Sequence, residues 1–64
     1  MKRIDLIRLL TKNGCELLRE GSRHSIWKNL ASGDITVVPR HKEIKKTLAR
    51  KICKDLFIKN PYVK

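Results

Sequence analysis

The chain has 64 residues, of which 16 are lysine or arginine and six are aspartate or glutamate, giving a formal net charge of +10. A chain of this length forms one small domain that buries roughly 60% of its unfolded surface, which argues against a deep substrate cavity and favours an active site on an open surface. The positive charge favours polyanionic partners, with nucleic acid first and the acidic surface of a protein second.

Cysteine usage and hydropathy narrow the class of protein further. Cys15 and Cys53 are too few for a disulfide scaffold and lie in apolar patterns, which predicts reduced cysteines in the core. The cysteines and the two histidines lack metal-ligand spacing, so we expect neither a metal site nor a small-molecule cofactor. No apolar stretch approaches the ~20 residues of a membrane span and no signal peptide is recognisable, so we expect a cytoplasmic protein that does not contact membranes.

The chain opens with a predicted amphipathic helix over residues 2–13. Apolar residues recur there at helical spacing, and Asn13-Gly14 is a good stop because glycine supplies the left-handed conformation that commonly ends helices. The predicted apolar face comprises Ile4, Leu6, Ile7, Leu9 and Leu10.

Three short strands are predicted next, over residues 15–20, 23–28 and 35–38. Gly21-Ser22 is expected to turn the chain into the second strand, and Ser32-Gly33-Asp34 to join the second and third strands as a hairpin. Side-chain alternation in the second strand then places His24 and Ile26 on one face and Ser25 and Trp27 on the other. Trp27 is expected to be a packing residue and not a base-stacking platform.

A second helix is predicted to begin at Ile44, because apolar residues recur one turn apart from there to Leu56. The predicted order is therefore α-β-β-β-α, an α+β fold with a three-stranded antiparallel sheet and both helices on one face, leaving the other face open to a ligand. The opposite face of the second helix carries a ridge of cations, which is explained by solvation or by a docked anion. The predicted ridge is Lys42, Lys46, Arg50 and Lys54.

His24 is the strongest candidate for chemistry. Imidazole exchanges protons near neutral pH and suits general acid–base catalysis, such as removal of the proton from an RNA 2′-OH so that its oxygen attacks the adjacent phosphate. Neighbouring cations would hold that phosphate, with Arg23 and Lys28 as candidates, although alternation turns Arg23 to the other face if the strand begins there. The alternative is that His24 is an ordinary strand residue.

Other polar residues extend this candidate site. Ser22 is expected to shape the turn and to contact phosphate, and His41 is either a second proton carrier or an exposed loop residue near a helix start. The complete predicted RNA-binding set is Ser22, Arg23, Lys28, Arg40, His41, Lys46, Arg50 and Lys54.

Three motifs occur together in this short chain: a first helix ending in Lys12-Asn13-Gly14, the element Gly21-Ser22-Arg23-His24, and the run Val37-Val38-Pro39-Arg40-His41. In this combination the sequence resembles the HicA family of toxins, small mRNA interferases of toxin–antitoxin modules. The resemblance covers residues 1–58 as one domain and leaves residues 59–64 as a loosely ordered tail.

The resemblance implies a fold like that of a double-stranded-RNA-binding domain and a metal-independent endoribonuclease that cleaves mRNA and inhibits translation. The family's catalytic histidine maps onto His24. The implied partner is a HicB-like antitoxin that masks the active surface. Two positions depart from the family pattern: Phe57 follows Leu56 where many members have glycine, and Arg23 replaces the first of two adjacent histidines.

Two alternatives from other classes stay open. A noncatalytic basic module would bind RNA or DNA in a salt-sensitive way without cutting the strand. A protein-interaction domain would use the same charge to meet an acidic partner without touching nucleic acid.

Overall fold

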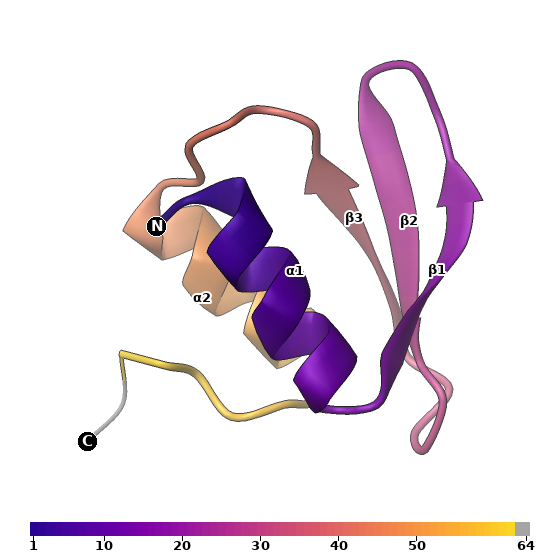
Figure 1. The fold of residues 1–64 in the computed structure, drawn as a ribbon. Coiled ribbons are helices and arrows are strands. Elements are labelled where there is room, and N and C mark those ends of the chain that lie inside the picture. The colour runs from indigo at the N-terminus through magenta and orange to yellow at the C-terminus, as the bar shows by residue number, and fades with distance from the viewer. Residues whose placement is uncertain (63–64) are drawn as a thin grey trace.

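The computed structural model describes residues 1–62 and confirms the predicted order α-β-β-β-α. The elements are α1 (Arg3–Lys12), β1 (Cys15–Glu20), β2 (His24–Asn29), β3 (Ile35–Pro39) and α2 (Lys46–Asp55). The strands form one antiparallel sheet in the order β1-β2-β3. Both helices cover the same face of this sheet, as predicted, and the other face is left uncovered by helices (Figure 1).

The register of β2 against its neighbours decides which side chains face the helices. Trp27 pairs with Leu17 of β1 and with Thr36 of β3, and a bulge between Leu17 and Arg19 shifts the register of β1. Along β2, Ser25, Trp27 and Asn29 are buried, whereas the residues between them are more exposed. The predicted alternation is therefore confirmed, with Trp27 packed in the core.

The core lies between the sheet and the two helices and includes both cysteines. Cys15 and Cys53 are buried and unbridged, as predicted. Burial raises the pKa of both thiols, and for Cys53 the neighbouring Cys15 raises the pKa further. Both groups are therefore protonated thiols at neutral pH and act as small apolar core residues.

The apolar face of α1 is narrower than predicted. Leu6 and Leu10 are completely buried, whereas Ile4 is 57% exposed. A helix turns about 100° per residue, so the five predicted apolar positions span more of its circumference than one layer of packing can cover. The helix packs through Leu6 and Leu10, with Ile7 and Leu9 partly buried against the core, and Ile4 alone of the predicted face lies at the surface.

The second helix begins at Lys46, two residues later than predicted. Ile44 is buried, but in an extended segment whose amide donates to the Met1 carbonyl at 2.8 Å. The Arg3 amide likewise donates to the Lys42 carbonyl at 2.8 Å, and Lys2 and Glu43 form an isolated antiparallel bridge. These long-range pairs keep residues 42–44 outside the helix. The prediction that placed Lys42 on the helical ridge was therefore wrong.

The end of α2 has a regular capping geometry with an unusual residue in it. The amide of Ile58 donates to the carbonyl of Cys53, and the amide of Phe57 donates to the carbonyl of Lys54. These are the two bonds of a Schellman motif. Phe57 has a φ of 57°, a left-handed conformation that glycine normally supplies. The missing glycine noted in the sequence thus leaves the capping geometry in place and puts a phenylalanine in it.

The segment after α2 returns along the helices. The ammonium group of Lys46 lies 5.1 Å from the centre of the Tyr62 ring. The loosely held tail predicted for residues 59–64 stays a prediction, and residues 63 and 64 lie outside the described residues. Among residues 1–62, none of the helices combines the length and the apolar character that crossing a bilayer requires.

Candidate functional site

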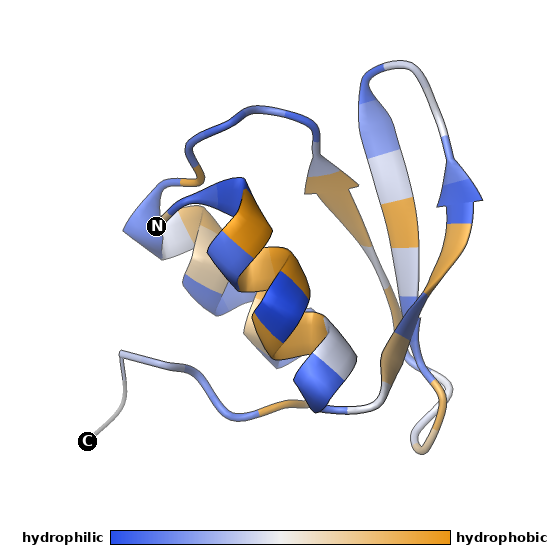
Figure 2. Ribbon diagram, viewed as in Figure 1, coloured by the Kyte–Doolittle hydropathy of each residue, from blue (hydrophilic) through white to orange (hydrophobic). Residues whose placement is uncertain are grey.

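Five of the nine predicted site residues line one shallow depression at the end of the sheet. This end is formed by the turn between β1 and β2 and by the connection from β3 to α2. Figure 2 shows that this connection is hydrophilic except for a short apolar stretch near α2. His24 pairs with Pro39 across the sheet, and the Arg40 amide donates to the Arg23 carbonyl at 3.2 Å. The residues lining the depression are Ser22, Arg23, His24, Arg40 and His41.

The turn before β2 sets the position of His24. The Gly21 amide donates to the His24 carbonyl at 2.8 Å, which closes a turn with Ser22 and Arg23 as its two central residues. A Cβ on residue 21 would lie only 2.8 Å from the same carbonyl oxygen. Glycine is thus required here by close backbone approach and not by a left-handed φ.

The strand begins one residue later than predicted, and this changes the place of Arg23. Because β2 starts at His24, Arg23 lies in the turn, and its side chain does not follow the alternation between the two faces of the strand. Arg23 therefore lines the same depression as His24 and is not turned to the opposite face. Both side chains are exposed to solvent.

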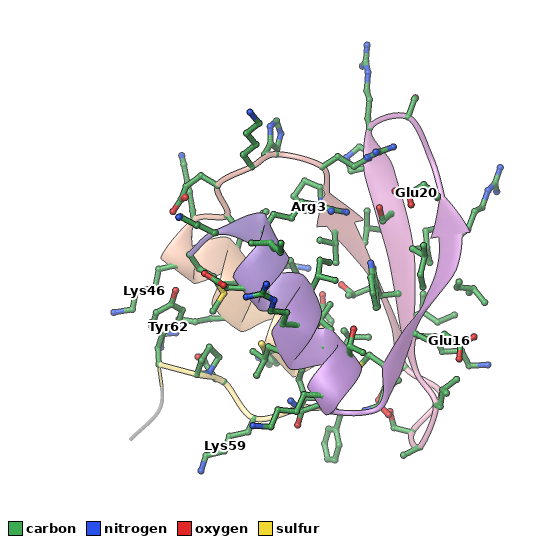
Figure 3. All side chains as sticks on the ribbon, in the orientation of Figure 1. Arg3, Glu16, Glu20, Lys46, Lys59 and Tyr62 are labelled. Carbon is green, nitrogen blue, oxygen red and sulfur yellow. The ribbon has the colours of Figure 1, made fainter. Side chains whose placement is uncertain are left out.

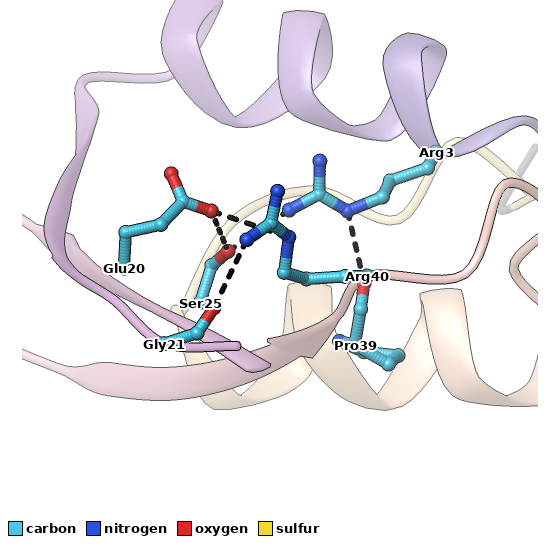
Figure 4. Close-up of polar contacts among 6 residues, drawn as sticks. All are labelled: Arg3, Glu20, Gly21, Ser25, Pro39 and Arg40. Carbon is cyan, nitrogen blue, oxygen red and sulfur yellow. Dashed lines mark hydrogen bonds and ion pairs between the residues drawn. The ribbon is translucent and has the colours of Figure 1, made fainter. Parts of the chain in front are cut away.

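Arg40 is held in place by two contacts across the turn (Figure 4). Its Nη1 donates to the Gly21 carbonyl at 3.1 Å, and its Nε forms an ion pair with Glu20 Oε1 at 3.5 Å. Both partners of the ion pair are about half exposed, so its net energy is small, in the range of about 0–1 kcal/mol. The main effect of these contacts is to fix the guanidinium beside the turn.

Glu20 also belongs to a part-buried hydrogen-bond network around the buried Ser25, which sequence reasoning missed. The hydroxyl of Ser25 donates to Glu20 Oε1 at 2.9 Å and accepts a bond from Arg3 Nη2 at 3.0 Å. Arg3 Nε also donates to the Pro39 carbonyl at 2.9 Å. Figure 4 shows the side chains of Arg3, Glu20 and Ser25 converging beside the guanidinium of Arg40. The one signal in the sequence was Ser25, a polar residue at a strand position predicted to face inward.

Lys28 does not join the depression. It lies on the same face of β2 as His24 but four residues further along, a separation of about 13 Å at 3.3 Å per residue. Its strand neighbours are Glu16 of β1 and Ile35 of β3. Between these two positions, Ile26 and Val37 form an apolar stretch of the open face, and together with Arg19, Gly21 and His24 they line a second shallow hollow.

The cationic ridge of α2 lies away from the His24 depression. Lys46, Arg50 and Lys54 are exposed and follow each other at four-residue spacing. Figure 3 shows Lys46 projecting from the helical side of the molecule, opposite Glu16 on the far side of the sheet. The predicted RNA-binding residues therefore divide into one set around His24 and one set on α2, with Lys28 apart from both.

Among residues 1–62, no group of three or more histidine, cysteine, aspartate or glutamate residues is arranged to hold a metal ion. The groups that can do chemistry in the depression are two imidazoles, two guanidiniums and one hydroxyl. Such a set can transfer protons and bind an oxyanion such as phosphate.

Comparison with known protein families finds one that matches this chain. The family model described as HicA toxin of bacterial toxin–antitoxin matches residues 4–58, most of the chain and all nine predicted site residues. The chain belongs to the HicA toxin family. It is accordingly a toxin of a toxin–antitoxin module, and membership implies an antitoxin as its partner. Neither the search of curated proteins nor the search of solved structures finds a match.

The HicA match includes both segments that build the depression. The turn carrying His24 and the connection carrying Arg40 and His41 fall well inside residues 4–58. Arg3, which anchors the network of Ser25 and Glu20, lies one residue before the matched range. The geometry around Arg3 therefore comes from the structure and not from the family match.

Proposed function

We propose that this toxin is an endoribonuclease that cleaves mRNA without a metal ion and uses His24 as its general base or acid. The observation that carries the proposal is the exposed imidazole of His24 in one depression with the guanidiniums of Arg23 and Arg40. An open depression suits a polymeric substrate, which cannot enter an enclosed pocket. The two guanidiniums suit the phosphate of that substrate.

The proposed reaction is an internal transfer at phosphorus. A general base takes the proton of the ribose 2′-OH, the 2′ oxygen forms a bond to the adjacent phosphorus, and the bond from phosphorus to the 5′ oxygen breaks. A general acid then returns a proton to the departing 5′ oxygen. The products are a 2′,3′-cyclic phosphate and a 5′-hydroxyl, and no water or cofactor is consumed. Arg23 and Arg40 would stabilise the charge that develops on the phosphate oxygens.

Two proton carriers are needed in this scheme, and the depression holds two imidazoles. His24 is fixed through its backbone by Gly21, whereas His41 lies on the connection after β3. We assign His24 the principal role because the turn fixes its backbone, and we assign His41 the complementary one. Ser22 would donate a hydrogen bond from its hydroxyl to a phosphate oxygen.

The antitoxin partner is inferred to be HicB-like and to cover this depression. An acidic surface on that protein would meet Arg23 and Arg40, and binding there would exclude RNA from His24. Antitoxin and RNA would then compete for the same surface of the toxin.

The test compares the wild-type toxin with the His24→Ala variant, first by induced expression and then with purified protein and RNA. We expect growth arrest and RNA fragmentation from the wild type only, and a cleavage rate about 10²- to 10⁴-fold lower for the variant. RNA affinity and the circular dichroism spectrum should be nearly unchanged. Undiminished cleavage by the variant would overturn the role of His24.

The His41→Ala variant separates the two imidazoles. We expect it to slow cleavage and to change its dependence on pH, because one of two titrating groups is removed. Analysis of the product ends checks the chemistry, since the scheme requires a cyclic phosphate. RNA binding by the wild type without any scission would instead favour the noncatalytic binding module.

A further inference from the structure

A groove runs beside the first half of α1, next to the depression that contains His24. Its volume is about 590 Å³, which falls within the range of about 300–1,000 Å³ typical of small-ligand sites. Arg40 lines both this groove and the His24 depression, so the two hollows share a wall. We call the groove beside α1 the α1 groove. Its lining residues are Lys2, Arg3, Ile4, Ile7, Arg40, Lys42 and Glu43.

The α1 groove has an apolar side. Ile4 and Ile7 lie one turn apart on α1, Ile4 away from the Leu6–Leu10 side and Ile7 at the edge of that side, where it packs against the core. Ile4 is 57% exposed and Ile7 is half-buried. Exposed isoleucine beside cations forms a surface that can contact the flat face of a base while charged groups hold the phosphates.

The rim of the groove carries unneutralised positive charge. Lys2 and Lys42 are exposed, and within residues 1–62 neither of them forms an ion pair. Glu43, the one acidic residue in the lining, pairs with the amine of Met1 at 3.0 Å. Arg3 is committed to the carbonyl of Pro39 and to Ser25. The cations available to a ligand are therefore the two lysines and part of Arg40.

We propose that the α1 groove binds the single-stranded RNA next to the cleaved phosphodiester. A base would lie against Ile4 and Ile7, phosphates would contact Lys2 and Lys42, and Arg40 would connect the groove to His24. This inference rests on the proposed ribonuclease function and adds substrate-binding residues to it. It also predicts that RNA does not run along the ridge of α2, none of whose residues line the α1 groove.

The test measures RNA affinity against salt concentration in the His24→Ala background, where the RNA should stay intact. The groove variant is Lys2→Ser with Lys42→Ser, and the matched control is Lys46→Ser with Arg50→Ser, which removes the same charge from α2. Lys2 is the N-cap of α1 and makes no side-chain cap bond, so serine there should not weaken the helix. The probe is a single-stranded oligoribonucleotide.

We expect the groove variant to lower the slope of log affinity against log salt by about 1.4, since each phosphate contact on a single strand contributes about 0.7. The control should change the slope much less. Equal losses in the two variants, or no loss in the groove variant, would overturn the proposal while leaving the ribonuclease assignment standing. Failure of the His24→Ala parent to bind RNA at all would overturn both.

The apolar side of the groove has its own test. Ile4→Ser should weaken RNA binding several-fold without changing the salt slope, because it removes a contact to a base and not to a phosphate. Leu30→Ser is the matched control, since Leu30 is 60% exposed in the connection between β2 and β3, at the other end of the sheet. Equal affinities of the two serine variants would contradict base binding by Ile4.

Discussion

The carbonyl oxygen of His24 lies 2.8 Å from the amide nitrogen of Gly21 and equally close to the position that a Cβ on residue 21 would occupy. Any side chain at position 21 must therefore push the start of β2 away. The first residue that moves is His24. Glycine at this position thus controls the placement of the proposed catalytic imidazole.

Gly21→Ala should lower the rate of RNA cleavage far more than it lowers stability. A shift of about 1 Å at a catalytic group can reduce a rate by about 100-fold, whereas overpacking typically lowers the free energy of unfolding by about 1–3 kcal/mol. Single-turnover cleavage and urea unfolding of the same preparation measure the two effects.

The control for Gly21 is Gly33→Ala in the connection between β2 and β3. Gly33 has a φ of 81° and would place its Cβ in open space. We expect it to lose about 1–2 kcal/mol of stability through backbone strain and to cleave RNA normally. Equal cleavage by the Gly21 and Gly33 variants would show that the close approach does not position His24.

Ser25→Ala should destabilise the fold by about 0.5–1.5 kcal/mol, because it removes one hydrogen-bond partner from Arg3 and one from Glu20. Ser25 is completely buried and bonds to both of them. The Arg3→Met variant and the double variant complete a double-mutant cycle in urea. We expect a coupling energy of about 0.5–3 kcal/mol. Strict additivity would contradict the network.

The features of the sheet that depend only on neighbouring residues could be predicted from the sequence. The two-residue period predicted that His24 and Ile26 face outward and that Trp27 is buried, because each of these depends only on neighbouring residues. The antiparallel order followed from turn residues in the same way. The depression around His24 was only partly predictable, since its second half comes from the connection after β3.

Long-range pairing explains what the pattern missed. The bond from Arg3 to Pro39 joins residues 36 positions apart, and α1 gives no local sign that one of its arginines is inside a network. The bridge between Lys2 and Glu43 similarly delays the start of α2 and removes Lys42 from its ridge. This ridge and His24 lie on different sides of the molecule. Sequence periodicity does not predict this, because it describes each element separately and not how the elements are arranged.

Asp55→Asn should weaken the fold at neutral pH and have little effect in acid. Hydrogen bonds from Lys51 at 3.0 Å and from Thr36 at 3.1 Å hold the pKa of the Asp55 carboxyl below its ordinary value. Because the folded pKa is lowered, its stabilisation is fully present above the unfolded pKa, about 3.9, and is lost as the pH falls through the folded pKa.

Urea unfolding of wild type and Asp55→Asn at pH 7 and again near pH 2–3 measures this difference. Asparagine can still accept the Thr36 hydrogen bond, so the comparison reports mainly on the charge. The two unfolding midpoints should converge as the pH falls. A difference that stays constant over that range would mean that the carboxylate charge contributes nothing.

Phe57→Gly should stabilise the toxin by about 1 kcal/mol. Phe57 occupies the left-handed position of the cap of α2 with a φ of 57°, and its side chain is 80% exposed. The left-handed conformation costs an L-residue about 1–2 kcal/mol, part of which is offset because glycine loses more backbone entropy on folding. In a domain of this size, 1 kcal/mol raises the melting temperature by about 4–8 °C.

Phe57→Ala distinguishes the backbone effect from the loss of the ring. Alanine keeps the Cβ and therefore the strain, so its melting temperature should stay near or below that of the wild type. The two hydrogen bonds of the cap, from Phe57 to Lys54 and from Ile58 to Cys53, are made by the backbone and should survive in both variants. A stabilisation shared equally by glycine and alanine would attribute the effect to the exposed ring and not to the left-handed backbone.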